Sequence, residues 1–209
     1  GVLITLYGEK TGVRLAFVVA FALGLVALVL QQTLIEDDGL RGKPEKRPSK
    51  LWRFMSPALR NLLVSDILIR FAEQIPYAFV VVWCMKLHGI SAIQFGVLTT
   101  IEMATAVLVY IPVAYLADRS GKKPFVVITF VNFAAFPLVL LFSRSFPMMV
   151  VAFIIRGLKE FGEPTRKALI MDLAPEGRKA GMFGLYYLVR DCIVSAAALG
   201  GAFLWQISP

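Results

Sequence analysis

Long stretches without charged side chains alternate with short charged connections along this chain. Residues 15–34 and 125–143 contain no charged residue, and residues 89–117 contain only Glu102. About twenty predominantly apolar residues are enough to cross the hydrocarbon core of a membrane as a helix. The pattern therefore predicts six membrane-spanning helices and a further half-span at 1–7. The six helices are predicted at 13–34, 58–85, 90–117, 124–143, 146–172 and 180–206.

The composition agrees with this pattern. Hydrophobic residues make up 58% of the 209 residues, charged residues make up 17%, and the mean hydropathy is +0.73. A soluble domain carries about 25% charged residues, so the sequence predicts an integral membrane protein. Cys84 and Cys192 both fall in apolar segments, which implies no disulfide. The chain starts at Gly1 without a methionine, which favours an internal piece of a longer protein.

The connections are strongly basic on one side only. The segment 35–60 and the connections 118–124 and 174–179 contain twelve Lys and Arg residues, whereas the connections on the other side contain four. The positive-inside rule therefore places loops 35–57, 118–124 and 174–179 in the cytoplasm. The net charge of +8 follows from this topology. No nucleic-acid partner is expected, because the basic residues lie in loops next to the membrane.

The second basic connection contains the motif AYLADRSGKKPFV at residues 114–126. Its Asp-Arg-x-Gly-basic-basic-Pro pattern between two membrane helices resembles the signature loop of the major facilitator superfamily, which lies between the second and third helices of each six-helix half. The family pattern has glycine where this chain has Ala114. The loop glycine permits a tight turn, and the two lysines favour the anionic leaflet. The resemblance implies a conformational latch formed by Asp118, Arg119, Gly121, Lys122 and Lys123.

The resemblance also implies an overall architecture. It predicts an all-α membrane protein with a partial major-facilitator-type helix bundle, whose spans are equivalent to helices six to eleven of the family. Residues 1–34 would end the N-terminal half, residues 35–57 would form the basic cytoplasmic loop between the halves, and residues 58–209 would form the C-terminal half without its last helix. The expected partners are the lipid bilayer and the missing N-terminal half. The expected location is the cell membrane, as a bacterial inner-membrane protein.

Charged residues recur near the middle of four predicted helices. At about 1.5 Å of rise per residue, they reach a common depth. The residues near this level are Glu73, Glu102, Lys159, Glu160, Arg190 and Asp191. A charge that faces lipid costs roughly 2.5–3.5 kcal/mol on insertion scales, so these side chains are expected to face the bundle interior. Arg70 and Glu163 lie on the same helical stripes as Glu73 and Glu160. The set predicts a substrate and proton pathway, at the level where such transporters bind.

Glu102 is the leading candidate for a proton carrier. It has no partner within its own helix, and a carboxylate in a low-dielectric environment takes up a proton more readily. Glu160 and Glu163 have basic neighbours and are expected to be ion-paired. The alternative is that these charges are structural salt bridges between helices, as for an Asp66–Arg70 pair.

Pro164 predicts a kink in the fifth of the six helices. Proline removes a backbone hydrogen bond, and Gly157 and Gly162 lie close by. Arg166 and Lys167 are assigned to the last turn of that helix, at its cytoplasmic end.

The leading functional hypothesis is a secondary active transporter that moves a small polar molecule and is coupled to protons. The alternatives are a facilitative uniporter, or a transport-inactive sensor or lipid-handling protein on the same fold. An enzyme is not expected, because a membrane metalloprotease needs paired histidines and the chain has only His88. No cofactor or metal is expected.

Overall fold

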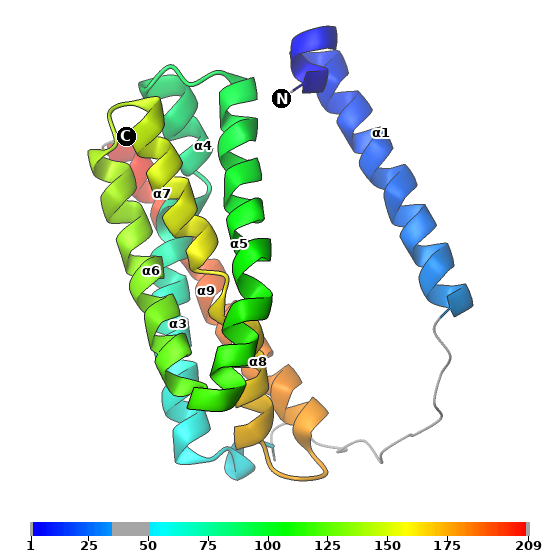
Figure 1. Cartoon of the computed structure of the whole chain (residues 1–209), viewed down its shortest axis with the longest axis vertical. Coiled ribbons are helices and arrows are strands. Elements are labelled where there is room, and N and C mark those ends of the chain that lie inside the picture. The colour runs from blue at the N-terminus through cyan, green and yellow to red at the C-terminus, as the bar shows by residue number, and fades with distance from the viewer. Residues whose placement is uncertain (1, 35–50, 208–209) are drawn as a thin grey trace.

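The protein is helical throughout the part that the computed structural model describes, residues 2–34 and 51–207 (Figure 1). The helices are α1 (Val2–Leu34), α3 (Pro57–Tyr77), α4 (Val80–Val82), α5 (Ala92–Ser120), α6 (Lys123–Phe142), α7 (Phe146–Leu158), α8 (Gly162–Leu173) and α9 (Lys179–Ile207). A 3₁₀ turn at Trp52–Phe54 precedes α3, and a π-helical turn at Trp83–Leu87 follows α4. The predicted all-α class is confirmed. Most of the predicted loop 35–57 lies outside the described residues.

Five segments of the described chain are long and apolar enough to cross a membrane. They are Lys10–Leu34, Pro57–Leu87, Ala92–Ser120, Lys123–Phe142 and Lys179–Ile207. These match five of the six predicted spans. The prediction at 146–172 differs, because this stretch forms two helices of 13 and 12 residues, each shorter than a membrane span. Placed end to end, α7 and α8 run along the bundle beside α5 and α6 (Figure 1).

Local capping fixes where α3 begins and where α5 ends. The side-chain oxygen of Ser56 accepts a hydrogen bond from the amide of Leu59 at the start of α3. Gly121 ends α5 with a φ of 92°, in the region that favours glycine. Only Gly121 and Lys122 separate α5 from α6, so the loop is shorter than the predicted 118–124.

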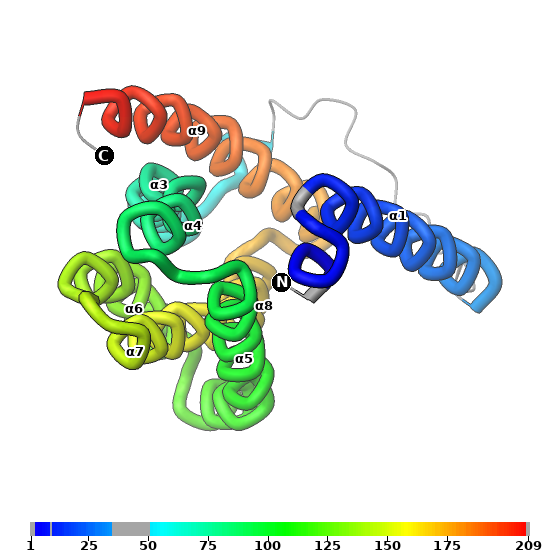
Figure 2. Tube along the Cα trace, turned by 90° about the horizontal axis from the view of Figure 1, so that it is seen from above, coloured from blue at the N-terminus to red at the C-terminus, as the bar shows by residue number. Residues whose placement is uncertain are grey.

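The helices enclose two apolar clusters with a polar layer between them. α3 and α4 lie between α9 and α6, and α7 lies between α6 and α5 (Figure 2). The cluster at the end with the basic connections includes Leu59, Leu63, Ile170, Met182 and Tyr186, and the cluster at the opposite end includes Cys84, Leu98, Phe136, Met149 and Phe153. The charged residues of α3 and of the α7–α8 segment lie in sequence between these two sets. Apolar packing therefore closes the polar layer at both ends.

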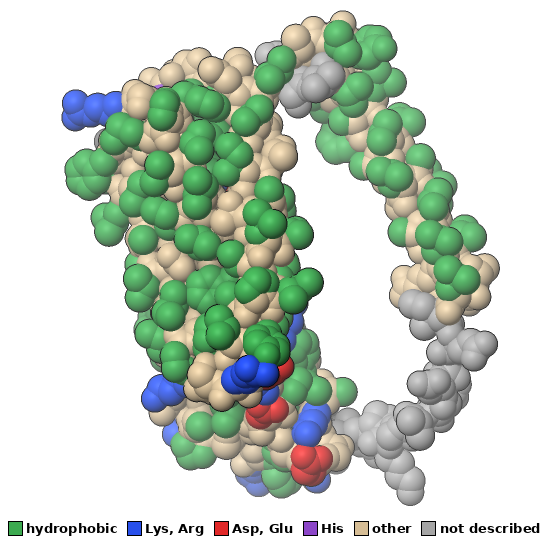
Figure 3. Space-filling view, viewed as in Figure 1, with side chains coloured by type: hydrophobic (Ala, Val, Ile, Leu, Met, Phe, Trp, Pro, Cys, Tyr) green, Lys and Arg blue, Asp and Glu red, His purple; other side chains and the backbone are tan. Residues whose placement is uncertain are grey.

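α1 lies to one side of the bundle (Figure 1), and the face of the described chain seen in Figure 3 is largely apolar above its charged lower end. Phe17 of α1 is one of many large apolar side chains that are exposed. Near its start, α1 reverses direction at Gly8, which has a φ of 78°, and the first residues fold back against Gly12. The predicted half-span at 1–7 is thus a short helical stretch that turns back. Its assignment to the other half of a transporter stays a prediction.

Gly201 allows α9 to approach α3 closely. A Cβ at Gly201 would overlap the carbonyl oxygen of Ile75, whereas a Cβ at Gly200 would meet no atom within 4 Å. Gly201→Ala is therefore expected to lower the free energy of unfolding by about 1–3 kcal/mol, because the two helices must move apart. Gly200→Ala is the matched control and should keep this free energy or raise it by up to about 1 kcal/mol, because alanine favours a helix over glycine. Unfolding of the full-length protein in SDS–detergent mixed micelles measures both values, and equal stabilities would contradict the close contact.

Candidate functional site

The segment that carries most of the buried charge is interrupted between α7 and α8. The amides of Glu160, Phe161 and Glu163 donate hydrogen bonds to carbonyl oxygens three residues earlier, which is a tight 3₁₀-like pattern. The kink predicted at Pro164 is therefore displaced. The break lies at residues 159–161, and Pro164 lies in the first turn of α8, where its missing amide hydrogen has no intrahelical partner to lose.

Two glycines on either side of the break bring neighbouring helices close. A Cβ at Gly157 would overlap the carbonyl oxygen of Glu102 on α5, and a Cβ at Gly162 would overlap the side chain of Thr129 on α6. The sequence associates both glycines with the kink predicted at Pro164. In the structure they serve close packing, so α5 and α6 hold the two sides of the break.

α3 presents a stripe of three charged residues to this broken segment, and each meets an opposite charge. Asp66 Oδ1 lies 2.5 Å from Arg166 Nη1, Arg70 Nη2 lies 3.0 Å from Glu163 Oε2, and Glu73 forms an ion pair with Lys159. The residue numbers of the partners fall along the broken segment as those of α3 rise, because the two segments run antiparallel. We call Asp66, Arg70, Glu73, Lys159, Glu163 and Arg166 the charge ladder.

Each cation of the charge ladder contacts two carboxylates. Arg70 also binds Glu73 at 3.2 Å, Lys159 lies 3.7 Å from Glu160, and Arg166 also pairs with Glu163. The ring of Phe133 on α6 lies beside two of these cations, 4.5 Å from the guanidinium carbon of Arg70 and 5.2 Å from the ammonium nitrogen of Lys159. The buried charges are thus paired, as low-dielectric surroundings require.

The ion pairs between α3 and the broken segment, which we call the rungs of the charge ladder, differ in solvent exposure. The Asp66–Arg166 rung is closed to solvent, and the Arg70–Glu163 rung is partly open to it. Asp66 and Arg166 are completely or almost completely buried, at 0% and 1% exposure. The side chains of Arg70 and Glu163 keep 21% and 20% exposure. A polar molecule could therefore approach the Arg70–Glu163 rung first.

The structure corrects two assignments in this region. Arg166, placed at the cytoplasmic end of its helix by sequence, lies in the interior. The predicted alternative of an Asp66–Arg70 pair is not formed among the described residues, because Asp66 binds Arg166 and Arg70 binds carboxylates. The predicted pathway set had therefore missed Asp66 and Arg166. The only sequence signal was the spacing of Asp66 with Arg70 and Glu73, which put all three on one face.

Arg190 and Asp191 of α9 behave differently from each other. Arg190 Nη1 lies 3.5 Å from Asp66 Oδ2, which joins α9 to the charge ladder. The hydroxyl of Tyr186 donates a hydrogen bond to the same oxygen at 3.1 Å. Asp191 binds Arg190 at 2.7 Å, but its side chain is 60% exposed and does not enter the interior of the described bundle. Arg190 thus extends the charge ladder to a third helix.

Glu102 also has a partner that the sequence did not identify. Its Oε1 lies 3.1 Å from Nε of Arg156, in the last turn of α7, and both residues are buried. The pair lies next to the charge ladder but shares no ion pair with it among the described residues. Glu102 is therefore an ion-paired carboxylate inside the membrane bundle, instead of an isolated one.

The signature loop lies at the basic end of the bundle, where α5 meets α6. Lys122 Nζ lies 2.5 Å from Asp172 Oδ2, near the end of α8. The guanidinium carbon of Arg119 lies 4.2 Å from the centre of the Tyr115 ring, so this arginine stacks on its own helix. The Lys122–Asp172 pair therefore links the loop directly to α8, which carries Glu163 and Arg166 of the charge ladder.

The remaining polar residues of the loop make no such contact. Asp118, in the last turn of α5, forms no hydrogen bond or ion pair with a described residue. Lys123 is exposed and is the first residue of α6. Of the five predicted latch residues, Lys122 makes the contact that could act as a latch in the described part of the chain.

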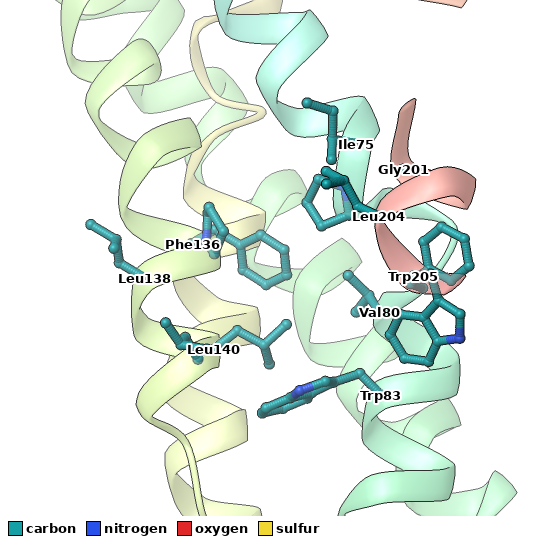
Figure 4. Close-up of a pocket in the computed structure, with 13 residues that line it drawn as sticks. Ile75, Val80, Trp83, Phe136, Leu138, Leu140, Gly201, Leu204 and Trp205 are labelled. Carbon is teal, nitrogen blue, oxygen red and sulfur yellow. The ribbon is translucent and has the colours of Figure 1, made fainter. Parts of the chain in front are cut away.

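An apolar groove of about 390 Å³ lies away from these charges, between α3–α4, α6 and α9 (Figure 4). Val80, Trp83, Phe136, Leu140 and Trp205 point toward it, and no charged residue lines it. Its chemistry suits hydrocarbon, in contrast to the charge ladder.

Residues 62–208 match the Major Facilitator Superfamily. An uncharacterized MFS-type transporter of Bacillus subtilis (strain 168) is 23% identical over 146 residues, which cover 66% of this chain and 34% of that protein. An uncharacterized MFS-type transporter of Methanocaldococcus jannaschii is 28% identical over 100 residues, which cover 47% of this chain and 25% of that protein.

The chain thus spans about a third or less of the length of these curated relatives. No solved structure matches it. The family match covers well over half of the chain, and the described helices have the length and apolar surface of a multi-pass membrane protein. The resemblance seen in the signature loop is confirmed, and this chain belongs to the Major Facilitator Superfamily.

Proposed function

We propose that the full-length protein is a secondary active transporter that moves a small polar molecule across the cell membrane by alternating access, coupled to protons. The charge ladder is the observation that carries this proposal, because it places six charged side chains inside a membrane-spanning bundle. Desolvating such pairs costs more than packing apolar residues of similar size, so the fold alone does not require them. Intramembrane charges are typical of substrate and proton pathways. The transporter names of the two relatives support the same proposal.

The break between α7 and α8 is the proposed hinge of the transporter. Short 3₁₀ stretches within helices often mark hinges. A change of angle at the break would separate Lys159 from Glu73, or Glu163 from Arg70, and would open the charge ladder to a polar solute. The Lys122–Asp172 pair would then hold one of the two arrangements at the basic end, which the positive-inside rule places in the cytoplasm.

The Glu102–Arg156 pair is the proposed site of proton coupling. A proton on Glu102 would neutralise its carboxylate and release Arg156 from the pair. Loss of the pair would loosen the contact between α5 and the last turn of α7, directly before the break. Proton binding and hinge movement would then favour each other, which is the reciprocity that coupling requires.

Replacing Glu102 by glutamine tests the coupling. Full-length protein is reconstituted into liposomes, and uptake of labelled amino acids, monocarboxylates and organic amines is measured with and without an imposed pH gradient. The natural protein is expected to take up at least one of these solutes faster with the gradient. Glu102→Gln should remove the stimulation and keep exchange of the solute without a gradient, because the amide cannot carry the proton.

Glu176→Gln is the matched control, because Glu176 lies in the exposed connection before α9 and pairs only with Lys179 among the described residues. It should keep the stimulation. Gradient-driven uptake that persists in Glu102→Gln would show that Glu102 is not the coupling residue. Uptake without any stimulation in the natural protein would favour a uniporter.

A further inference from the structure

Arg156 differs from every other buried cation of the described bundle in how few partners it has. Each cation of the charge ladder binds two carboxylates, whereas Arg156 lies within ion-pair distance of Glu102 alone. The contact to Glu102 uses Nε, at 3.1 Å. No described residue accepts a hydrogen bond from Arg156, although only 8% of the residue is exposed.

This arrangement leaves the outer edge of the guanidinium without a protein acceptor. A guanidinium has five N–H donors in a planar fork, and the fork formed by the two Nη groups matches the two oxygens of a carboxylate. The buried donor of Arg156 that lacks a hydrogen-bond acceptor is Nε, whereas its Nη groups are not fully buried and make no hydrogen bond to a described residue. The free Nη edge of Arg156 is therefore chemically suited to a planar oxyanion.

Aromatic rings surround the same guanidinium. Its central carbon lies 5.3 Å from the ring centre of Tyr77, 5.1 Å from that of Phe136 and 5.5 Å from that of Phe153. The rings stabilise the cation through their faces and exclude water, but they cannot accept its N–H groups in good geometry. Tyr77 is 49% exposed, so this side of the site borders the surface of the described bundle.

We propose that Arg156 is an anion subsite that binds the carboxylate group of the transported solute, a monocarboxylate whose apolar body lies against Tyr77, the exposed ring of the three. This inference rests on the proposed transport function. The solute's carboxylate takes the Nη fork of Arg156, and the proton that enters with it binds the Glu102 carboxylate. One negative charge and one positive charge thus enter together, and the net charge of the site does not change.

The neighbours of Glu102 are compatible with this exchange. The charged groups that face it are Arg156 of α7, Lys159 and Glu160 of the break, and Glu73 of α3. Lys159 is already paired with Glu73 and Glu160, so it does not compete for the incoming carboxylate. Arg156 is then the available cation at this level of the described chain.

Ligand-induced thermal stabilisation of the purified full-length protein tests the subsite without any transport. The probes are sodium acetate, butyrate, hexanoate and benzoate, each beside its primary amide, with chloride keeping the ionic strength constant. At least one carboxylate is expected to raise Tm in a saturable way while its amide does not. Arg156→Lys should weaken the apparent affinity by at least tenfold, because ammonium lacks the planar fork, and Arg156→Gln should abolish binding.

Arg144→Gln is the control, because Arg144 is exposed in the connection between α6 and α7. It should bind as the natural protein does. If Arg156→Gln fails to fold with Glu102 unpaired, the double variant Glu102→Gln/Arg156→Gln removes both charges and should also fail to bind. Saturable binding that survives in either variant, or no carboxylate-specific binding at all, would overturn the inference. Gradient-driven uptake of amines alone would overturn it while leaving the proposed transport function intact.

Discussion

Arg166→Met is expected to lower the free energy of unfolding of the full-length protein by about 3–5 kcal/mol, the usual cost of removing one partner from a buried ion pair. Arg166 is 1% exposed and binds Asp66, which is completely buried. Without the guanidinium, the closed rung of the charge ladder would hold a carboxylate with only the more distant Arg190 and the hydroxyl of Tyr186. Unfolding in SDS–detergent mixed micelles, followed by circular dichroism, gives the difference.

A double variant separates the cost of leaving Asp66 without its partner from the cost of the changed side-chain volume. Asp66→Asn/Arg166→Met removes both charges and keeps a group that can accept from Tyr186, so its stability should return to within about 1–2 kcal/mol of the natural protein. Lys122→Met is the exposed counterpart, because the side chain of its partner Asp172 is largely in solvent, and should cost at most about 1 kcal/mol. Equal losses in Arg166→Met and Lys122→Met would contradict the burial of the Asp66–Arg166 rung.

The spans and one side of the charge ladder could be predicted from sequence because both are local properties. Hydropathy adds up over neighbouring residues, so the long uncharged runs locate the membrane helices to within a few residues. Helical spacing alone puts Asp66, Arg70 and Glu73 on one stripe. The signature loop is equally local, and it was enough to identify the family.

The partners of that stripe could not be predicted, because they lie 100, 93 and 86 positions away in the chain. Which residue of the second segment meets which residue of α3 depends on the break at 159–161. Counting depth along one continuous helix put Arg166 at the cytoplasmic end. In the structure Arg166 lies in the interior instead, bound to Asp66. The same limit hid Arg156 as the partner of Glu102.

Lys159→Gln is expected to reduce solute uptake by the full-length protein by about 100-fold, which corresponds to about 2.7 kcal/mol of activation free energy. Lys159 is the only cation of the charge ladder that lies in the break itself, and its ammonium joins that turn to Glu73 of α3. If movement at the break exchanges this pair between two arrangements, glutamine removes the charge that both arrangements use. Lys86→Gln, at an exposed lysine after α4, is the matched control and should keep uptake within about twofold, as surface substitutions usually do.

The double variant Glu73→Gln/Lys159→Gln shows whether this ion pair takes part in transport or only stabilises the fold. In this double variant no buried charge is left over from the pair, since Arg70 keeps Glu163 and Glu160 keeps partial exposure. Its stability should therefore approach that of the natural protein, by the same reasoning as for the closed rung. A pair with a purely structural role would then recover uptake together with stability. A pair that takes part in transport would recover stability alone, and uptake would stay about 100-fold low. Restored uptake in the double variant would remove the Glu73–Lys159 pair from the transport mechanism and leave it as a salt bridge between α3 and the break.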